Sequence, residues 1–329
     1  MGGSASYRLA KKIANAKASG ASQDEIAKLE RRREEAKALE RIRRFKWNKE
    51  YQGNPNRDYG KGNTSDAMQE IKGGGGNAPK PNSLSEYLDE NGNLTPERAA
   101  LHKQIIDALI KGKKPVGEGE TPVMVMYGGG PASGKSSVLG KMYENPDEAT
   151  TVTIDPDEIK KYLPGYLDMA KVDDGAAGFY HEESSMIAKQ LAEVLFKENY
   201  NTIYDGTGDG SVKSVMAKIN GARSRGYKVN AAYVTVDTDE ALRRNQKRYD
   251  DALARGETAR LPDPNIVRIT HKKVTQILSQ LSGEFDDVKL FDNNGKSGKL
   301  IATGSRGGKL TPVKGEENDF NSFLKKGDE

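Results

Sequence analysis

A glycine-rich loop motif is the feature of this sequence that most restricts its fold. A short apolar run at residues 123–127 is followed at once by a segment that satisfies G-x-x-x-x-G-K-S. Its residues are Gly129, Gly130, Pro131, Ala132, Ser133, Gly134, Lys135 and Ser136. Glycines let successive backbone N–H groups turn toward phosphate oxygens, and a following helix adds its positive N-terminal end. The motif therefore predicts a strand, a phosphate-binding loop and a helix in direct succession.

The letters of this loop predict how a nucleotide would bind. Lys135 is expected to bridge the β- and γ-phosphates, and the Ser136 hydroxyl is expected to be a magnesium ligand. We include Ser137, the next residue, in the predicted nucleotide-binding segment. The cofactors predicted in this way are ATP and Mg²⁺. The sequence shows neither an apolar strand ending in Asp-Glu nor an N-K-x-D motif. These absences favour a compact small-molecule kinase over a water-activating ATPase or a GTPase.

The rest of the chain from residue 122 alternates between two patterns. Short apolar runs that predict strands lie at residues 123–127, 151–154, 202–204, 229–236 and 288–291. Helical stretches lie between them at about 135–144, 180–198, 212–225, 238–254 and 264–282. Alternating βα units are typical of a mostly parallel sheet with helices on both faces. We therefore predict an α/β fold of the P-loop kinase type, and a hairpin near residues 296–309.

The N-terminal part differs from this body in charge. Residues 1–52 hold 14 Lys and Arg against 7 Asp and Glu, although the whole chain carries only +4. We predict a basic helical extension over residues 1–51, with one long helix at about 23–45. Its arginines could contact nucleic-acid phosphates, but interleaved glutamates favour packing on the protein itself.

Two further segments follow the basic extension. Residues 52–83 are rich in Gly, Asn and Pro and lack apolar periodicity, so we predict a flexible linker. The kinase domain is then expected to span residues 84–329. It includes a helix that begins after Thr95, where a capping residue precedes a proline.

Composition excludes several kinds of chemistry. The chain has no cysteine, so disulfides, thiolate metal sites and cysteine nucleophiles are excluded. The three histidines, His102, His181 and His271, are scattered along the chain, and we expect His102 and His271 to be ordinary surface or half-buried residues. No apolar run approaches the roughly 18 residues of a membrane span, so we expect no membrane partner and a cytoplasmic location.

Carboxylates follow the second and third predicted strands. Asp157 lies in the segment I-D-P-D at residues 154–157, and Asp205 and Thr207 lie in D-G-T-G at residues 205–208. The carboxyl ends of parallel strands lie beside the loop, where a ligand binds. An aspartate there can accept the proton of an attacking hydroxyl or hold magnesium through water. Asp157 could equally cap the helix that follows.

Arginines downstream complete the candidate site. Arg248 lies on a predicted helix and Arg260 follows a loop. Phosphoryl transfer spreads negative charge over the equatorial oxygens, and arginines can stabilise that charge. The alternative is that both arginines are ordinary surface charges.

The ordered set of motifs resembles the zeta-toxin family of P-loop kinases. The resemblance rests on the following motifs, in this order: G-G-P-A-S-G-K-S, I-D-P-D, D-G-T-G, G-Y-K-V, K-R-Y and A-R. It covers about residues 84–310. The family phosphorylates a sugar hydroxyl of UDP-N-acetylglucosamine with ATP, and an antitoxin that obstructs the ATP site is expected as partner.

Roles carried over by this resemblance make Asp157 the general base and Arg248 and Arg260 the transition-state arginines. Asp205 stands where many members have glutamate, which affects substrate identity more than kinase activity. The stretch that contains Glu182 and Glu183 opens the helix that lines the family's acceptor pocket, so it is expected to contact substrate. The alternative is that it forms a surface cap of that helix.

Two other functions remain open on the sequence. One is a polynucleotide 5′-hydroxyl kinase in which residues 1–51 grip the strand. The other is a phage-associated partner-binding protein whose P-loop domain only senses nucleotide.

Overall fold

A computed structural model describes residues 5–30, 33, 47–60, 62–73, 78–170, 173, 175–255, 261–295 and 297–328. Within these residues one sheet forms the centre of the molecule, with the strand order β2-β3-β1-β4-β5-β6-β7. The strands are β1 (Val123–Gly128), β2 (Thr151–Ile154), β3 (Asn201–Asp205), β4 (Lys228–Thr235), β5 (Asp287–Asp292), β6 (Lys299–Ser305) and β7 (Thr311–Pro312).

The first five strands are parallel, and the last two are antiparallel. This arrangement confirms the predicted α/β fold with a mostly parallel sheet. The strand β1 lies between β3 and β4. The loop that follows β1 therefore leaves the carboxyl edge of the sheet next to the ends of both neighbours, where ligands of such sheets bind.

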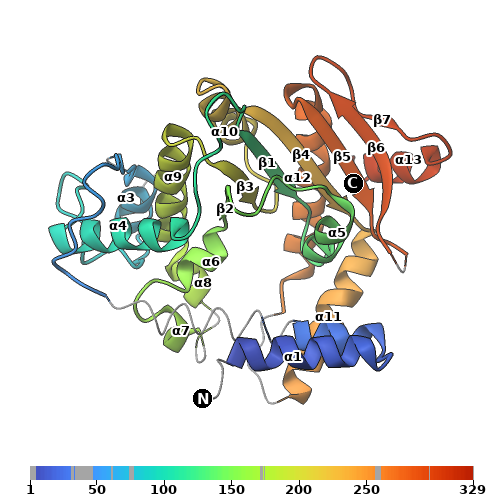
Figure 1. The fold of residues 1–329 in the computed structure, drawn as a ribbon, viewed down its shortest axis with the longest axis horizontal. Helices are drawn as coiled ribbons and strands as arrows, with labels where there is room; N and C mark the ends of the chain where they lie inside the picture. The colour runs from blue at the N-terminus through green and yellow to red at the C-terminus, as the bar shows by residue number, and fades with distance from the viewer. Residues whose placement is uncertain are drawn as a thin grey trace.

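Helices connect the strands and flank the sheet (Figure 1). They are α1 (Ala5–Ala18), α3 (Ser65–Lys72), α4 (Pro96–Ile110), α5 (Lys135–Met142), α6 (Pro156–Lys160), α7 (Tyr166–Met169), α8 (Ala176–Phe179), α9 (His181–Lys197), α10 (Val212–Arg223), α11 (Thr238–Ala254), α12 (Pro264–Leu281) and α13 (Glu317–Lys325). Thr95 caps α4 as expected, because its side chain accepts from the Arg98 N–H and Pro96 occupies the first turn. No helix in the described ranges is long and apolar enough to cross a membrane.

The two faces of the sheet bury alternate residues of each strand, as a period of two requires. On one face Met124 and Ala231 belong to the large apolar core that also includes residues of α4, α9, α10 and α12. On the other face Val125 and Ala232 pack with Val138 and other residues against α5. The helix that follows the glycine-rich loop is therefore anchored directly on the central strands.

The described residues between 52 and 83 are not the flexible linker that their composition predicts. The segment contains α3, and Tyr59 within it is only 7% exposed. The Arg57 guanidinium pairs with Asp107 of α4 and with Glu198 at the end of α9, at 2.7 Å for the second pair. A few side chains anchor this segment to two helices, and such contacts leave no periodic pattern in the sequence.

The ends of the chain form elements that the sequence predicted only in part. The helix α1 lies within the predicted basic helical extension of residues 1–51, before the one long helix expected at about 23–45. Residues 23–30 are helical as predicted, whereas most of the predicted helix from 31 to 45 falls outside the described residues. The predicted hairpin is formed by β6 and β7, somewhat later than residues 296–309, and α13 follows it.

Candidate active site

The glycine-rich loop connects β1 to α5, as the motif predicts. Gly134, the residue before α5, has a left-handed backbone with a φ of 78°. A Cβ atom at Gly134 would lie 2.2 Å from Asn293 Nδ2, so both conformation and space require glycine there. The N–H groups of Lys135 and Ser136, the first two of α5, are available to a phosphate at this end, whereas the Ser137 N–H donates to Gly134 O.

Lys135 begins α5 and points to the end of β3. Its ammonium pairs with the Asp205 carboxylate and donates a hydrogen bond to Gly206 O at 2.7 Å. The loop after β3 is joined to the glycine-rich loop a second time, because Gly129 N–H donates to Thr207 O at 2.8 Å. Lys135, Asp205 and Thr207, which the sequence predicted separately, thus lie together at one edge of the sheet.

Three side chains hold the glycine-rich loop through contacts that the sequence did not predict. His271 of α12 contacts Pro131 O, Arg244 of α11 contacts Ala132 O, and Asn293 after β5 contacts Ser133 O. All three lie more than 100 residues after the loop, and no local pattern connects them with it. His271 is 4% exposed and packs on the loop, so the expectation of an ordinary histidine is wrong.

The two aspartates at the end of β2 have different environments. Asp155 is half-buried and caps α6, because its carboxylate accepts from Asp157 N–H at 2.8 Å and from Glu158 N–H at 3.3 Å. Burial, followed by the nearby Asp205 carboxylate, raises the pKa of Asp155 to about 6. Asp157 is exposed, and its carboxylate binds Lys160 at 2.6 Å. The capping role that the sequence left open for Asp157 belongs to Asp155.

These carboxylates fit a magnesium ion bound with nucleotide. Mg²⁺ prefers hard oxygen ligands and is commonly held by one or two carboxylates together with substrate phosphates. Asp155 and Asp205 interact unfavourably in the low dielectric near the loop, and a divalent cation between them would relieve that repulsion. The described residues contain no cluster of three His, Asp or Glu that forms a complete cage. Ser136 remains the predicted direct ligand.

Neutralising Asp155 is expected to stabilise the protein most at high pH. An acid with a raised pKa in the folded state costs stability as the pH rises from about 4 toward and above 6, since the buried form then becomes charged. Asn caps a helix about as well as Asp. We therefore expect Asp155→Asn to raise the free energy of unfolding at pH 8 by about 1 kcal/mol, and to raise it much less at pH 4.5. Melting temperatures measured at the two pH values check this difference.

This comparison is made without nucleotide or Mg²⁺ and uses Asp157→Asn as the matched control. The Asp157 carboxylate is exposed, so its replacement should not produce a pH-dependent gain. An equal effect of Asp155→Asn at both pH values would contradict the prediction.

Of the two predicted arginines, only one lies among the described residues. Arg248 is exposed on α11 and donates to the buried Asn245 Oδ1 at 2.6 Å. It lies one helical turn beyond Arg244, which contacts the loop. Arg260 lies outside the described residues.

Glu183 is not a surface residue of an acceptor pocket, so its predicted substrate contact is wrong. Its side chain is fully buried between α4 and α9, where it accepts from Arg98 Nε at 2.6 Å and lies 2.8 Å from His102 Nε2. The same contacts correct the expectation for His102, which is 1% exposed. Burial alone would raise the pKa of Glu183, but hydrogen bonds from His102 and Arg98 outweigh it and lower the pKa to about 2.

Glu182, the other predicted substrate contact on α9, is half-buried near α3. Burial raises its pKa, and the carboxylates of Asp66 and Glu70 on α3 raise it further. Asp66 and Glu70 belong to α3, within residues 52–83, and not to the glycine-rich loop.

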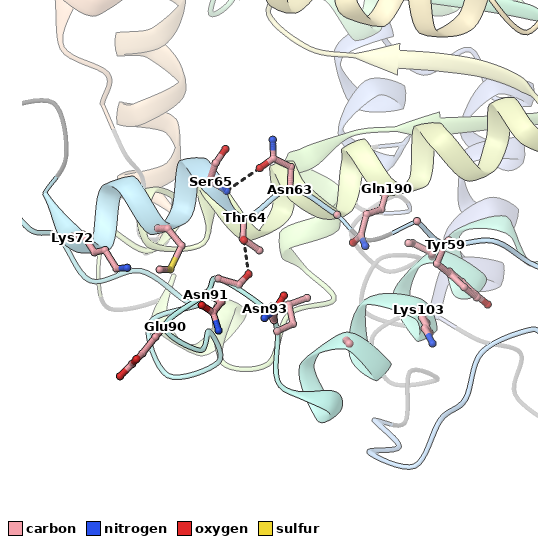
Figure 2. A pocket seen from close by; sticks show the side chains of 17 residues that line it. Tyr59, Asn63, Thr64, Ser65, Lys72, Glu90, Asn91, Asn93, Lys103 and Gln190 are labelled. Atoms are coloured by element: carbon pink, nitrogen blue, oxygen red, sulfur yellow. Dashed lines mark hydrogen bonds between the residues drawn. The ribbon is translucent and has the colours of Figure 1, made fainter.

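A cavity of about 810 Å³ lies apart from the loop, between α3, the turn at residues 90–94 and α4. Figure 2 shows polar side chains around it, including Asn63, Asn91 and Asn93, with Lys103 at one side and Lys72 at the other. None of the residues that the sequence predicts for the site lines this cavity. The candidate active site is therefore the carboxyl edge of the sheet.

Comparisons with known proteins point to one family. A protein-family model described as Zeta toxin matches residues 106–302. The toxin zeta of Streptococcus pyogenes is 23% identical over 201 residues, and that of Enterococcus hirae is 24% identical over 201 residues. Each alignment covers 58% of this chain and 66% of the relative, slightly less than two thirds of the relative's length.

Solved structures share the fold at low identity. A structure from the PezAT chromosomal toxin–antitoxin system of Streptococcus pneumoniae is 15% identical, with a TM-score of 0.50, over 70% of this chain and 93% of that chain. A complex of AvrRxo1-ORF1 and -ORF2 with ATP is 18% identical, with a TM-score of 0.52, over 75% of this chain and 78% of that chain.

Proposed function

Because the chain belongs to the zeta toxin family, we propose that it is an ATP- and Mg²⁺-dependent kinase that phosphorylates a hydroxyl of a nucleotide sugar such as UDP-N-acetylglucosamine. The observation that carries the proposal is the convergence of Lys135, Asp205 and the glycine-rich loop at one edge of the sheet. Three strands that are distant in sequence supply these groups. The loop follows β1, Asp205 ends β3, and Asp155 follows β2. The ATP present in one complex of the same fold supports the choice of nucleotide.

Each residue of the site has a proposed task. The backbone N–H groups at the start of α5 bind phosphate oxygens, and Lys135 exchanges its bond with Asp205 for the β- and γ-phosphates. Asp157 accepts the proton of the attacking hydroxyl, and Arg248 and Arg260 stabilise charge on the transferred phosphoryl group. A bound Mg²⁺ would supply neutralisation of phosphate charge. Ser136 would hold it directly, with Asp155 and Asp205 nearby.

The exposed position of Asp157 suits a proton acceptor that must reach an acceptor molecule. Its carboxylate is bound only by Lys160 among the described residues, at 2.6 Å, and its side chain is 84% exposed. An incoming hydroxyl can approach the exposed side of this carboxylate without displacing Lys160, whose own side chain is only 5% exposed. Asp155, by contrast, is already occupied with two backbone N–H groups.

The direct test is transfer of labelled γ-phosphate from ATP to UDP-N-acetylglucosamine in the presence of Mg²⁺. We expect Asp157→Asn to lower kcat by about 10²- to 10⁴-fold, the usual contribution of a general base, with ATP affinity unchanged. Glu158→Gln is the matched control, because Glu158 lies next on α6 and pairs with Lys161. Equal rates in wild type and Asp157→Asn would exclude Asp157 as the base. Transfer by the wild type to a different acceptor alone would exclude the nucleotide sugar.

We also propose an antitoxin as a protein partner. One structure of the same fold comes from the PezAT toxin–antitoxin system. Another is a complex of two proteins, AvrRxo1-ORF1 and -ORF2. The antitoxin is expected to reduce ATP binding. Titration of ATP into the chain alone and into its co-purified complex with the antitoxin would measure the difference in affinity.

A further inference from the structure

The outward face of the glycine-rich loop is held by side chains, one for each of three consecutive carbonyls. The pairs are Pro131 O with His271 Nε2 at 3.0 Å, Ala132 O with Arg244 Nη1 at 3.4 Å, and Ser133 O with Asn293 Nδ2 at 2.7 Å. We call His271, Arg244 and Asn293 the outer clamp. They come from α12, α11 and the residue after β5, so three separate elements converge on one loop.

The outer clamp is internally connected. Besides its contact with the loop, Arg244 donates to Asn293 O at 2.6 Å, and Glu240 binds the Arg244 Nε at 2.7 Å. Asn293 N–H in turn donates to Thr235 O at the end of β4. The clamp is therefore tied to the sheet on which the loop itself is mounted.

His271 is suited to donate to a carbonyl. Its ring is buried, and burial lowers its pKa, so the neutral form is favoured at ordinary pH. Pro131 O can only accept, so Nε2 must carry the hydrogen of this bond.

Two glycines of the motif lie where clamp side chains press on the backbone. A Cβ at Gly130 would lie 2.6 Å from Cε1 and Nε2 of the His271 ring, and one at Gly134 would lie 2.2 Å from Asn293 Nδ2. Gly130 is not among the residues with positive φ, so its backbone could accept a side chain. The His271 ring occupies the space that this side chain would need.

We propose that His271, Arg244 and Asn293 are positioning residues of the nucleotide site. A peptide group is planar, and its C=O and N–H point in opposite directions. Side chains that draw the Pro131 and Ser133 carbonyls outward therefore turn the N–H groups of Ala132 and Gly134 toward the phosphate side before nucleotide arrives. The Ser133 N–H, opposite Ala132 O, instead donates to Gly130 O within the loop. Preorganised donors of this kind bind more tightly because the cost of ordering them is met during folding. The inference rests on the proposed function only in requiring that the loop binds nucleotide.

The first test compares ATP dissociation constants and melting temperatures for variants of His271. We expect His271→Leu, which keeps bulk and loses the donor, to bind ATP about five- to tenfold more weakly, the effect of one hydrogen bond. His271→Gln, which can present an amide donor at a similar reach, should recover most of that loss. The control is Leu278→Ala on the same helix, where Leu278 is fully buried. It should lower the melting temperature without changing ATP affinity.

The second test uses the contact between Gly130 and His271. Gly130→Ala should weaken ATP binding by forcing the ring or the loop to move. Adding His271→Ala to that variant removes the ring, so the double variant should bind ATP more tightly than Gly130→Ala alone. Equal or weaker ATP binding by the double variant would contradict the contact between the His271 ring and the loop, on which the outer clamp rests.

The outcomes separate the clamp from the proposed function. Failure of the wild type to bind ATP would overturn the proposed function and the clamp with it. ATP binding by the wild type, with unchanged affinity in His271→Leu and Arg244→Gln, would overturn the clamp alone. The Arg244 side chain is 24% exposed, so Arg244→Gln should fold. If His271→Leu fails to fold, the ATP affinity of Arg244→Gln alone tests the outer clamp.

Discussion

Lys135→Ala is expected to lower phosphoryl transfer by about 10²- to 10³-fold or more, since it removes a cation aimed at the charge that develops in the transition state. The structure places the Lys135 ammonium at the end of β3, bound by Asp205 and by Gly206 O at 2.7 Å. The other lysine of α5, Lys141, lies in the last turn of the helix, away from the glycine-rich loop. The measurement is the steady-state rate of label transfer at saturating ATP.

The effect of Lys135→Ala should fall on catalysis and nucleotide binding and not on folding. Lys135 is partly exposed, and its loss leaves Asp205 unpaired at the rim of the site rather than in the core. Lys141→Ala on the exposed side of the same helix is the control and should retain full activity. Retained transfer in Lys135→Ala, at a melting temperature equal to that of the wild type, would contradict the proposed site.

Glu183→Gln is expected to destabilise the fold by about 3–5 kcal/mol, the cost of leaving a buried charge without its partner. The variant leaves the Arg98 guanidinium, whose side chain is only 7% exposed, without a carboxylate. Arg98 also lies 4.2 Å from the centre of the Tyr87 ring, so it cannot reach solvent without disturbing this packing. Chemical denaturation at pH 7 measures the effect.

The stabilising contribution of Glu183 also depends on pH. A carboxyl whose pKa is lowered to about 2 in the folded state contributes its full stability above the ordinary value of 4.5 and loses it as the pH falls toward 2. The wild type should therefore lose stability across this window more steeply than Glu183→Gln.

Glu182→Gln is the matched control for the stability prediction. Glu182 precedes Glu183 on α9, but its pKa is raised by burial and by neighbouring carboxylates. Removing its charge should leave stability unchanged or higher. A loss in Glu182→Gln equal to that in Glu183→Gln would show that the helix, and not the buried pair, is sensitive.

The elements that the sequence predicted correctly are those with local signals. The strands β1 to β5 and the helices α5 and α9 to α12 follow from apolar runs, caps and turn residues that act over a few positions. The helix α3 and the burial of Tyr59 do not, because their anchors are ion pairs and packing with helices far along the chain.

The candidate site divides in the same way. Lys135 and the loop were identified from the motif, since the backbone conformation that it needs restricts the residues in it. The local order of letters could not show that Glu183 is enclosed by Arg98 and His102, because both partners lie more than 80 residues earlier. Without them a carboxylate near the start of a helix is indistinguishable from a surface cap.

The sequence alone therefore determined a phosphate-binding loop between a strand and a helix, in an α/β sheet with carboxylates at its edge. Only the tertiary structure decided which carboxylates face that edge, which are buried, and which side chains hold the loop from behind. The physical reason is distance along the chain. Backbone conformation depends on neighbours a few residues away, whereas the burial and partners of Glu183 and His271 depend on where the whole chain brings α4, α9 and α12.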